Sequence, residues 1–132
     1  IANNAGQSSS ILELNQHKDI WPNVEYTSSI KLKSSTLKNV IKHEKIDIKK
    51  YQALIMDTQG SELLVLKGGS SLLKNFKYIK TEAADFESYK ECCLIKDLSK
   101  FLNKFGFKEI KKIKFATRKG GGNYFDILYE RK

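Results

Sequence analysis

The stretch YQALIMD (Tyr51–Asp57) decides the fold. It is a short apolar run that stops abruptly at an acid, and the residues that follow it, TQG (Thr58–Gly60), are typical of a turn. A fully buried strand of a parallel sheet has this pattern, because both of its faces are covered and no polar residues need to alternate with the apolar ones. We therefore expect a buried parallel strand whose carboxyl end is Asp57.

The segments after this strand predict an α/β unit. Ser61 to Leu73 carries an apolar stripe at helical spacing, although Gly68 and Gly69 weaken its later half. Further along, the patterns predict a strand at Tyr78–Ala83, a helix at Cys93–Phe105, and strands at Phe107–Phe115 and Tyr124–Tyr129. Strands that alternate with helices, followed by two strands joined by a short loop, indicate an α/β fold with a terminal antiparallel hairpin.

The segment before the central strand is less regular. Ile30 to Ser34 alternates apolar and polar residues, which predicts a half-buried strand. Thr36 can cap a short helix that carries Leu37, Val40 and Ile41 on one face. We expect irregular structure in most of the residues that precede these two elements.

The composition argues against nucleic-acid and membrane partners. The formal net charge is +9, but only Arg118 and Arg131 of the 24 basic residues are arginines, and base and phosphate recognition favours the arginine fork. No apolar run approaches the roughly 20 residues that span a bilayer. The adjacent Cys92 and Cys93 cannot build a disulfide framework. A reducing, cytoplasmic location is therefore expected.

The central segment resembles a known enzyme family. IMDTQGSELLVLKGGSSLL (Ile55–Leu73) is similar to the signature of FkbM-family methyltransferases, in which a strand ends in aspartate and a glycine, a glutamate and Leu-Lys-Gly follow. Three further segments resemble the family in the expected order: NNAGQSSSIL (Asn3–Leu12), TEAADFESYKECCLIKDLSKFLNKFGF (Thr81–Phe107) and YFDILY (Tyr124–Tyr129). The resemblance covers essentially the whole chain.

This resemblance implies a class I, Rossmann-like methyltransferase fold, with strand order 3-2-1-4-5-7-6 and S-adenosylmethionine as the cofactor. In the family, a glycine-rich loop after the first strand and an acid after the second hold the cofactor. No such strand-to-helix turn occurs here, and Gly120 to Gly122 precede a strand instead. Since the sequence also begins with Ile1, we expect residues 1–132 to be a C-terminal part of a methyltransferase domain. The N-terminal cofactor-binding part would be absent, and this piece alone would be inactive.

Two carboxylates are the main candidates for chemistry. Asp57 and Glu82 lie at or near the carboxyl ends of neighbouring strands, where parallel sheets carry their sites. Asp57 could be a base, a metal ligand or a hydrogen-bond anchor, or it could cap the helix that begins at Ser61. The pair could bind a divalent cation, but we expect no metal here, and the plainer interpretation of Glu82 is a buried acid paired with a lysine.

The other candidates belong to the segment expected to fold over the acceptor and to the turn after the central strand. His17 is the better placed of the two histidines to act as a general base, although a lone histidine is most often exposed. The candidates for substrate binding are Ser8, Ser9, Ser10, Gln59 and Glu62. Each has a plainer interpretation: loop serines, a turn residue, and an acid that favours the helix dipole.

These features favour an O-methyltransferase, in full-length form, that acts on a hydroxyl of a sugar or other small polar acceptor. The alternative is a non-catalytic binding module derived from half a methyltransferase. Two departures leave room for it, because Lys38 stands where the family often has aspartate and Gln59 where many members have glutamate. The oligomeric state is not indicated. However, Gln52 to Asp57 would form an open, apolar sheet edge in a fragment, which predicts self-association.

Overall fold

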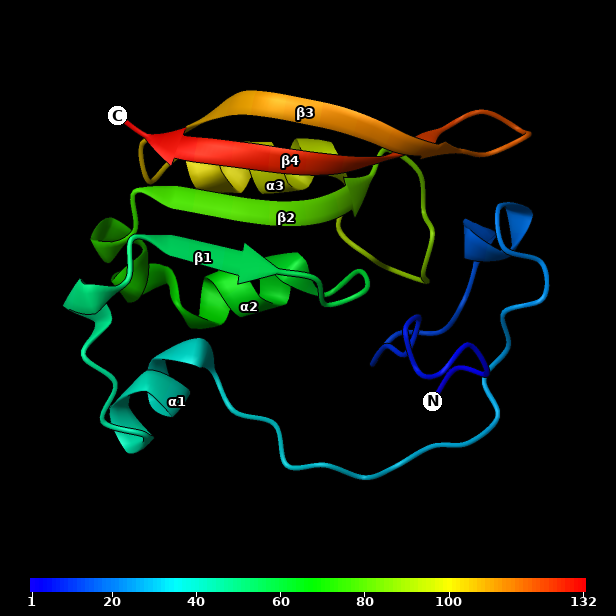
Figure 1. Ribbon diagram of the computed structural model, residues 1–132, viewed down its shortest axis with the longest axis horizontal. Helices are drawn as coiled ribbons and strands as arrows, with labels where there is room; N and C mark the ends of the chain where they lie inside the picture. The colour runs from blue at the N-terminus through cyan, green and yellow to red at the C-terminus, as the bar shows by residue number, and fades with distance from the viewer.

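The four strands of the computed structural model, which describes residues 1–132, form one mixed sheet in the order β1-β2-β4-β3 (Figure 1). Their bounds are Ala53–Met56 for β1, Tyr78–Ala84 for β2, Phe107–Thr117 for β3 and Asn123–Arg131 for β4. β1 and β2 are parallel, whereas β4 is antiparallel to both of its neighbours. The α/β fold with a terminal antiparallel hairpin is therefore confirmed.

Helices cover only one face of this sheet. The α-helices are α1 (Leu37–His43), α2 (Glu62–Gly68) and α3 (Ile95–Asn103), and short 3-10 helices occur at η1 (Gln16–Asp19), η2 (Ile48–Lys50) and η3 (Ser70–Asn75). In Figure 1, α2 and α3 lie behind the sheet, and no helix lies in front of it. None of these helices has the length and apolar composition needed to cross a bilayer.

The main core lies between the sheet and the two helices behind it. Leu66 of α2 and Leu98 of α3 belong to the same buried cluster as Ile79 of β2 and Ile127 of β4, and all four side chains are inaccessible to solvent. Burying a side chain of this size contributes roughly 1.5–3 kcal/mol. This packing fixes where the carboxyl ends of β1 and β2 lie.

The predicted strand from Ile30 to Ser34 is wrong. These residues have no regular structure, and Ile30 and Leu32 are 62% and 79% exposed. Alternation alone does not make a strand, because backbone groups in a sheet need a neighbouring strand to bond with, and none lies beside this segment.

The segment predicted as one helix from Ser61 to Leu73 is divided at its glycine pair. α2 ends at Gly68, and η3 follows after Gly69. A side chain on Gly69 would lie 2.8 Å from Leu37 Cδ2, so the missing side chains allow α1 to approach α2 closely. α1 itself begins as expected, with the Thr36 hydroxyl accepting the backbone N–H of Asn39 over 3.2 Å.

β1 is an edge strand of the sheet. It pairs only with β2, and the side chain of Ile55 is 72% exposed. This agrees with the open, apolar edge expected of these residues by themselves. The prediction of a fully buried strand is wrong, because no neighbouring strand covers this edge and only Met56 of the four residues is buried.

Candidate functional site

A crevice of about 380 Å³ lies where the carboxyl ends of β1 and β2 meet the N-terminal segment. Asp57 directly follows β1, Glu82 lies near the end of β2, and both line the crevice. The other lining residues are Asn4, Gln7, Ser8, His17, Trp21, Gln59, Phe115 and Tyr124. The volume falls within the range of small-molecule sites, roughly 300–1,000 Å³. A second hollow of about 10 Å³, room for about one water, shares four of these residues.

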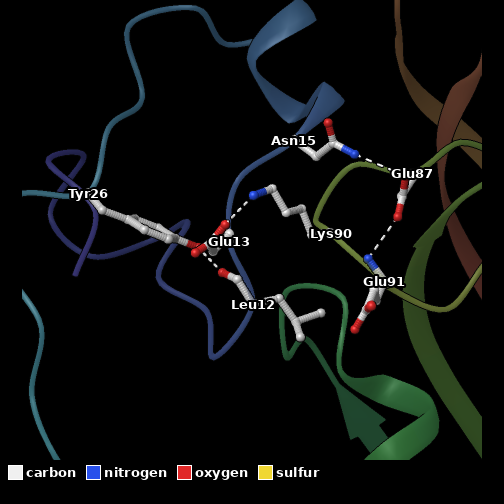
Figure 2. A network of polar contacts seen from close by, with 7 residues as sticks. All are labelled: Leu12, Glu13, Asn15, Tyr26, Glu87, Lys90 and Glu91. Carbon is white, nitrogen blue, oxygen red and sulfur yellow. Dashed lines mark hydrogen bonds and ion pairs between the residues drawn. The ribbon is translucent and has the colours of Figure 1, made fainter.

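The loop after β2 holds the N-terminal segment beside this crevice. Figure 2 shows two of the contacts: Asn15 Nδ2 donates to Glu87 Oε2 over 3.0 Å, and Lys90 forms an ion pair with Glu13. A carbonyl of the same loop accepts the backbone N–H of His17, also over 3.0 Å. Residues far apart in the sequence therefore lie at one site. In Figure 1, the N-terminal segment lies beyond the carboxyl end of β1.

The side chain of Gln59 is fixed from both ends. Its Nε2 donates to Asp57 Oδ1 over 2.5 Å, and its Oε1 accepts the hydroxyl of Tyr89 over 2.6 Å. The Ser10 hydroxyl donates to the backbone carbonyl of Gln59 over 2.7 Å. Gln59 therefore orients one oxygen of Asp57 and leaves the other free to meet a ligand.

Glu82 lies in an environment that disfavours its charge. Burial is the main cause of the raised pKa of its carboxyl, and the negative charges of Asp57, Asp126 and Glu62 raise it further. Lys80 opposes this effect, but its ammonium lies 3.1 Å from Asp126. The lysine next to Glu82 therefore pairs with Asp126, and not with Glu82 as predicted.

His17 is buried, with only 2% of its surface exposed. Burial lowers the pKa of its imidazole to about 4, so the ring is neutral at physiological pH. It packs against Trp21 and Tyr89, with ring centroids 4.7 and 5.2 Å away. Its Nδ1 has no hydrogen-bond partner in the protein. Buried polar atoms normally have a partner, so this atom is an unsatisfied group in a residue that lines the crevice.

Tyr124 is a second buried group without a partner. Its ring meets Trp21 edge-on at 5.4 Å, and its hydroxyl oxygen has no well-formed hydrogen bond, although Ser88 lies close enough to act on its pKa. Burial raises the pKa of this phenol, which therefore stays protonated. Tyr124 and Tyr89 are site residues that the sequence did not reveal, because Tyr124 is indistinguishable from the rest of its strand and Tyr89 lies in a loop without periodicity.

Glu62 organises the turn between β1 and α2. Its Oε1 accepts the backbone N–H of Thr58 over 2.9 Å, the hydroxyl of Thr58 over 3.1 Å and the backbone N–H of Gly60 over 3.2 Å. Its carboxylate is only 3% exposed and lines the smaller hollow, not the crevice. Asp57 does not cap α2, because the cap position is Ser61 and the bond of Asp57 is to Gln59.

The three serines have different surroundings. Ser8 lines the crevice, and its hydroxyl accepts Asn4 Nδ2 over 2.9 Å. The Ser9 hydroxyl accepts the backbone N–H of Ala2 over 3.0 Å, and Ser10 is bonded to the turn at Gln59. Of these three, only Ser8 faces the crevice.

The implied cofactor, S-adenosylmethionine, does not find a complete site among these residues. Gly60 is the one glycine between β1 and α2, and a side chain there would lie 3.0 Å from Cys92 Cβ and 3.1 Å from Tyr89 Cδ2. The space beside this glycine is therefore filled by the protein and is not an open cradle. Gly120 to Gly122 lie in the β3–β4 hairpin. Nor do three or more His, Cys, Asp or Glu side chains form a metal-binding group.

Comparison with known proteins agrees with this architecture. The family model described as "Methyltransferase FkbM domain" matches residues 1–109. No curated protein and no solved structure gives a significant match. The matched region includes β1, the turn with Asp57 and Gln59, and β2 with Glu82. The chain belongs to the FkbM methyltransferase family.

Proposed function

We propose that this chain forms the acceptor side of an S-adenosylmethionine-dependent O-methyltransferase that acts on a hydroxyl of a sugar or other small polar metabolite. The observation that supports this most is the composition of the crevice. Asp57 and Glu82, at the ends of parallel strands, share it with the buried, unpartnered atoms of His17 and Tyr124. Polar groups gathered in this way suit a hydroxylated ligand.

The sheet supports the class I methyltransferase fold. The order β1-β2-β4-β3, with only β1 and β2 parallel, corresponds to the 4-5-7-6 half of the implied seven-stranded sheet. The open edge of β1 is the place where the first strand of that sheet would pair. We infer that residues outside this chain complete the sheet there and supply the site for the methyl donor.

Glu82 is the residue we assign as proton acceptor. A methyl acceptor hydroxyl loses a proton during transfer, and a base works best when its pKa is near the operating pH. The pKa of Glu82 is raised, towards neutrality, whereas that of His17 is lowered to about 4, away from it. His17 therefore suits the role of a neutral hydrogen-bonding group that orients the acceptor. Asp57, held by Gln59, anchors a second polar group.

The test is methyl transfer by the complete gene product that contains these 132 residues. Labelled S-adenosylmethionine is supplied with a panel of hydroxylated acceptors, and the active acceptor is then used with Glu82→Gln. Loss of a general base lowers the rate by roughly 10²–10⁴-fold, whereas Glu44→Gln, on the exposed end of α1, should retain it. Full activity of Glu82→Gln, or transfer to no acceptor, contradicts the proposal. The isolated chain should neither bind the donor tightly nor turn over.

A further inference from the structure

The charge of the crevice is opposite to that of the chain. The sequence has 24 lysines and arginines and a net charge of +9, yet no lysine or arginine lines either the crevice or the smaller hollow beside it. The ionisable acids in these walls are Asp57, Glu82 and Glu62. An anionic ligand such as a phosphate would meet only like charges here.

Two buried groups indicate that a ligand completes this site. His17 and Tyr124 are 2% and 8% exposed, both line the crevice, and His17 Nδ1 and the Tyr124 hydroxyl have no partner in the protein. Leaving a buried polar group unpaired costs roughly 1–3 kcal/mol. A ligand with hydroxyl groups would supply both missing hydrogen bonds.

The walls between the acids are aromatic. Phe115 and Tyr124 have ring centroids 5.7 Å apart, and Trp21 meets Tyr124 at 5.4 Å. All three line the crevice. The face of an aromatic ring attracts a cation, by about 0.5–2 kcal/mol. Acids and aromatic faces without any basic residue together select a positive charge.

We propose that the acceptor carries an ammonium group among its hydroxyls, as an amino sugar or another polyhydroxylated amine does, and that Asp57 binds this group. The inference rests on the proposed function and adds the charge class of the substrate. Asp57 suits this role because Gln59 fixes one of its oxygens and leaves the other without a protein partner. Glu82 remains available to take the hydroxyl proton.

The ammonium would also act on the ionisation of Glu82. The charged groups that act on this carboxyl are Asp57, Asp126, Glu62 and Lys80, and only Lys80 lowers its pKa. A second cation beside Asp57 offsets the repulsion between the two acids and stabilises the carboxylate form of Glu82. The acceptor would thereby ionise the base that it needs.

The experiment measures binding to the complete gene product by isothermal titration calorimetry with four matched probes: glucosamine, N-acetylglucosamine, glucose and glucose 6-phosphate. Glucosamine should bind about tenfold or more tightly than the neutral sugars, since a charge-assisted hydrogen bond contributes roughly 1.5–3 kcal/mol. Glucose 6-phosphate should bind most weakly. The preference for glucosamine should shrink in high salt. It should vanish in Asp57→Asn and persist in the exposed control Asp47→Asn.

Other outcomes overturn the inference. They are equal binding of glucosamine and glucose, tighter binding of the phosphate, no binding of any probe, or a preference that survives Asp57→Asn. A sulfonium is the other cation that could face these acids. An Asp57-dependent preference for S-adenosylmethionine over S-adenosylhomocysteine, without any preference among the sugars, would assign the acids to the donor and also contradict the inference.

Methyl transfer to the same probes separates this inference from the proposed function. If neutral sugars are methylated as efficiently as glucosamine, the enzyme assignment stands and the ammonium assignment is wrong. If glucosamine is bound preferentially but no probe is methylated, the charge selectivity stands and the proposed activity is contradicted.

Discussion

The hydroxyl of Tyr89 donates to Oε1 of Gln59 over 2.6 Å, and this bond joins the loop after β2 to the turn after β1. The amide of Gln59 in turn holds Asp57. A side chain with only 1% of its surface exposed therefore determines how an acid in the crevice is oriented. The contact is structural support for the site, and its strength can be measured without knowing the acceptor.

Tyr89→Phe should lower the free energy of unfolding by about 1–2 kcal/mol, because the partner amide loses its buried donor and the ring still fills its place. Urea denaturation of the chain followed by circular dichroism measures the change. Tyr51→Phe is the matched control, since Tyr51 is 54% exposed and its hydroxyl has no partner, and it should shift stability by less than about 0.5 kcal/mol. Equal effects of the two substitutions would show that the Tyr89 bond contributes nothing.

Glu62→Ala should destabilise the chain more strongly, by roughly 2–3 kcal/mol. It removes an oxygen that accepts two backbone N–H groups and one hydroxyl in a buried turn, and groups left unpaired in such a place are costly. The same denaturation measurement applies, with Glu44→Ala at an exposed position expected to be near neutral. If Glu62→Ala lowered the free energy of unfolding as little as the control does, Glu62 would have no structural role in this turn. It would then be only a lining residue of the smaller hollow.

The regular elements were largely predictable because their patterns are local. The strands Tyr78–Ala83 and Tyr124–Tyr129 agree with β2 and β4 to within a few residues, and the period of Cys93–Phe105 locates α3. The predicted strand from Ile30 to Ser34 does not form. Its alternating pattern is local, but a strand also needs a partner strand, and the pattern does not show whether one is present. The division of the predicted helix into α2 and η3 depends on how closely α1 packs against Gly69. This is a feature of the tertiary structure that a local pattern does not show.

The site was predictable only where topology dictates it. Asp57 and Glu82 could be brought together from the sequence because parallel neighbouring strands end at the same edge of a sheet. The contact of Tyr89 with Gln59 spans 30 positions and depends on the path of a loop. Tyr124 requires the register of β4, since a shift of one residue would turn its side chain to the other face.

His17 makes stability depend on pH with a defined sign. The unfolded state has the ordinary imidazole pKa of about 6.5, whereas burial lowers the folded value to about 4. Between these values the unfolded chain binds more protons, so stability falls as the pH drops from about 6.5 to 4 and is unaffected by this group at higher pH. Unfolding free energies at pH 7.5, 5.5 and 4.5 should show this slope, on a background from carboxylates.

The control for that slope is His17→Phe, which keeps a ring beside Trp21 and Tyr89 and removes the titrating group. The stability of the unsubstituted chain relative to His17→Phe should fall as the pH drops below about 6.5 and be constant above about pH 7. His43 is exposed and is present in both, so it cancels. Parallel curves for the two proteins would show that His17 is accessible to protons in the folded state.

The open edge of β1 should cause the isolated 132-residue chain to self-associate. An unpaired apolar edge strand offers free backbone donors and acceptors to a second copy, and Ile55 adds an exposed side chain there. Size-exclusion chromatography with light scattering should show the mass rising with concentration. Ile55→Glu should weaken this association about tenfold, because burial of the isoleucine is worth roughly 1.5–3 kcal/mol. Leu64→Glu makes the same change on α2, at a position 55% exposed, and should leave the association intact.

A chain that stays monomeric at every concentration would remove the argument that β1 needs a neighbouring strand, and with it the support that this edge gives to a larger sheet.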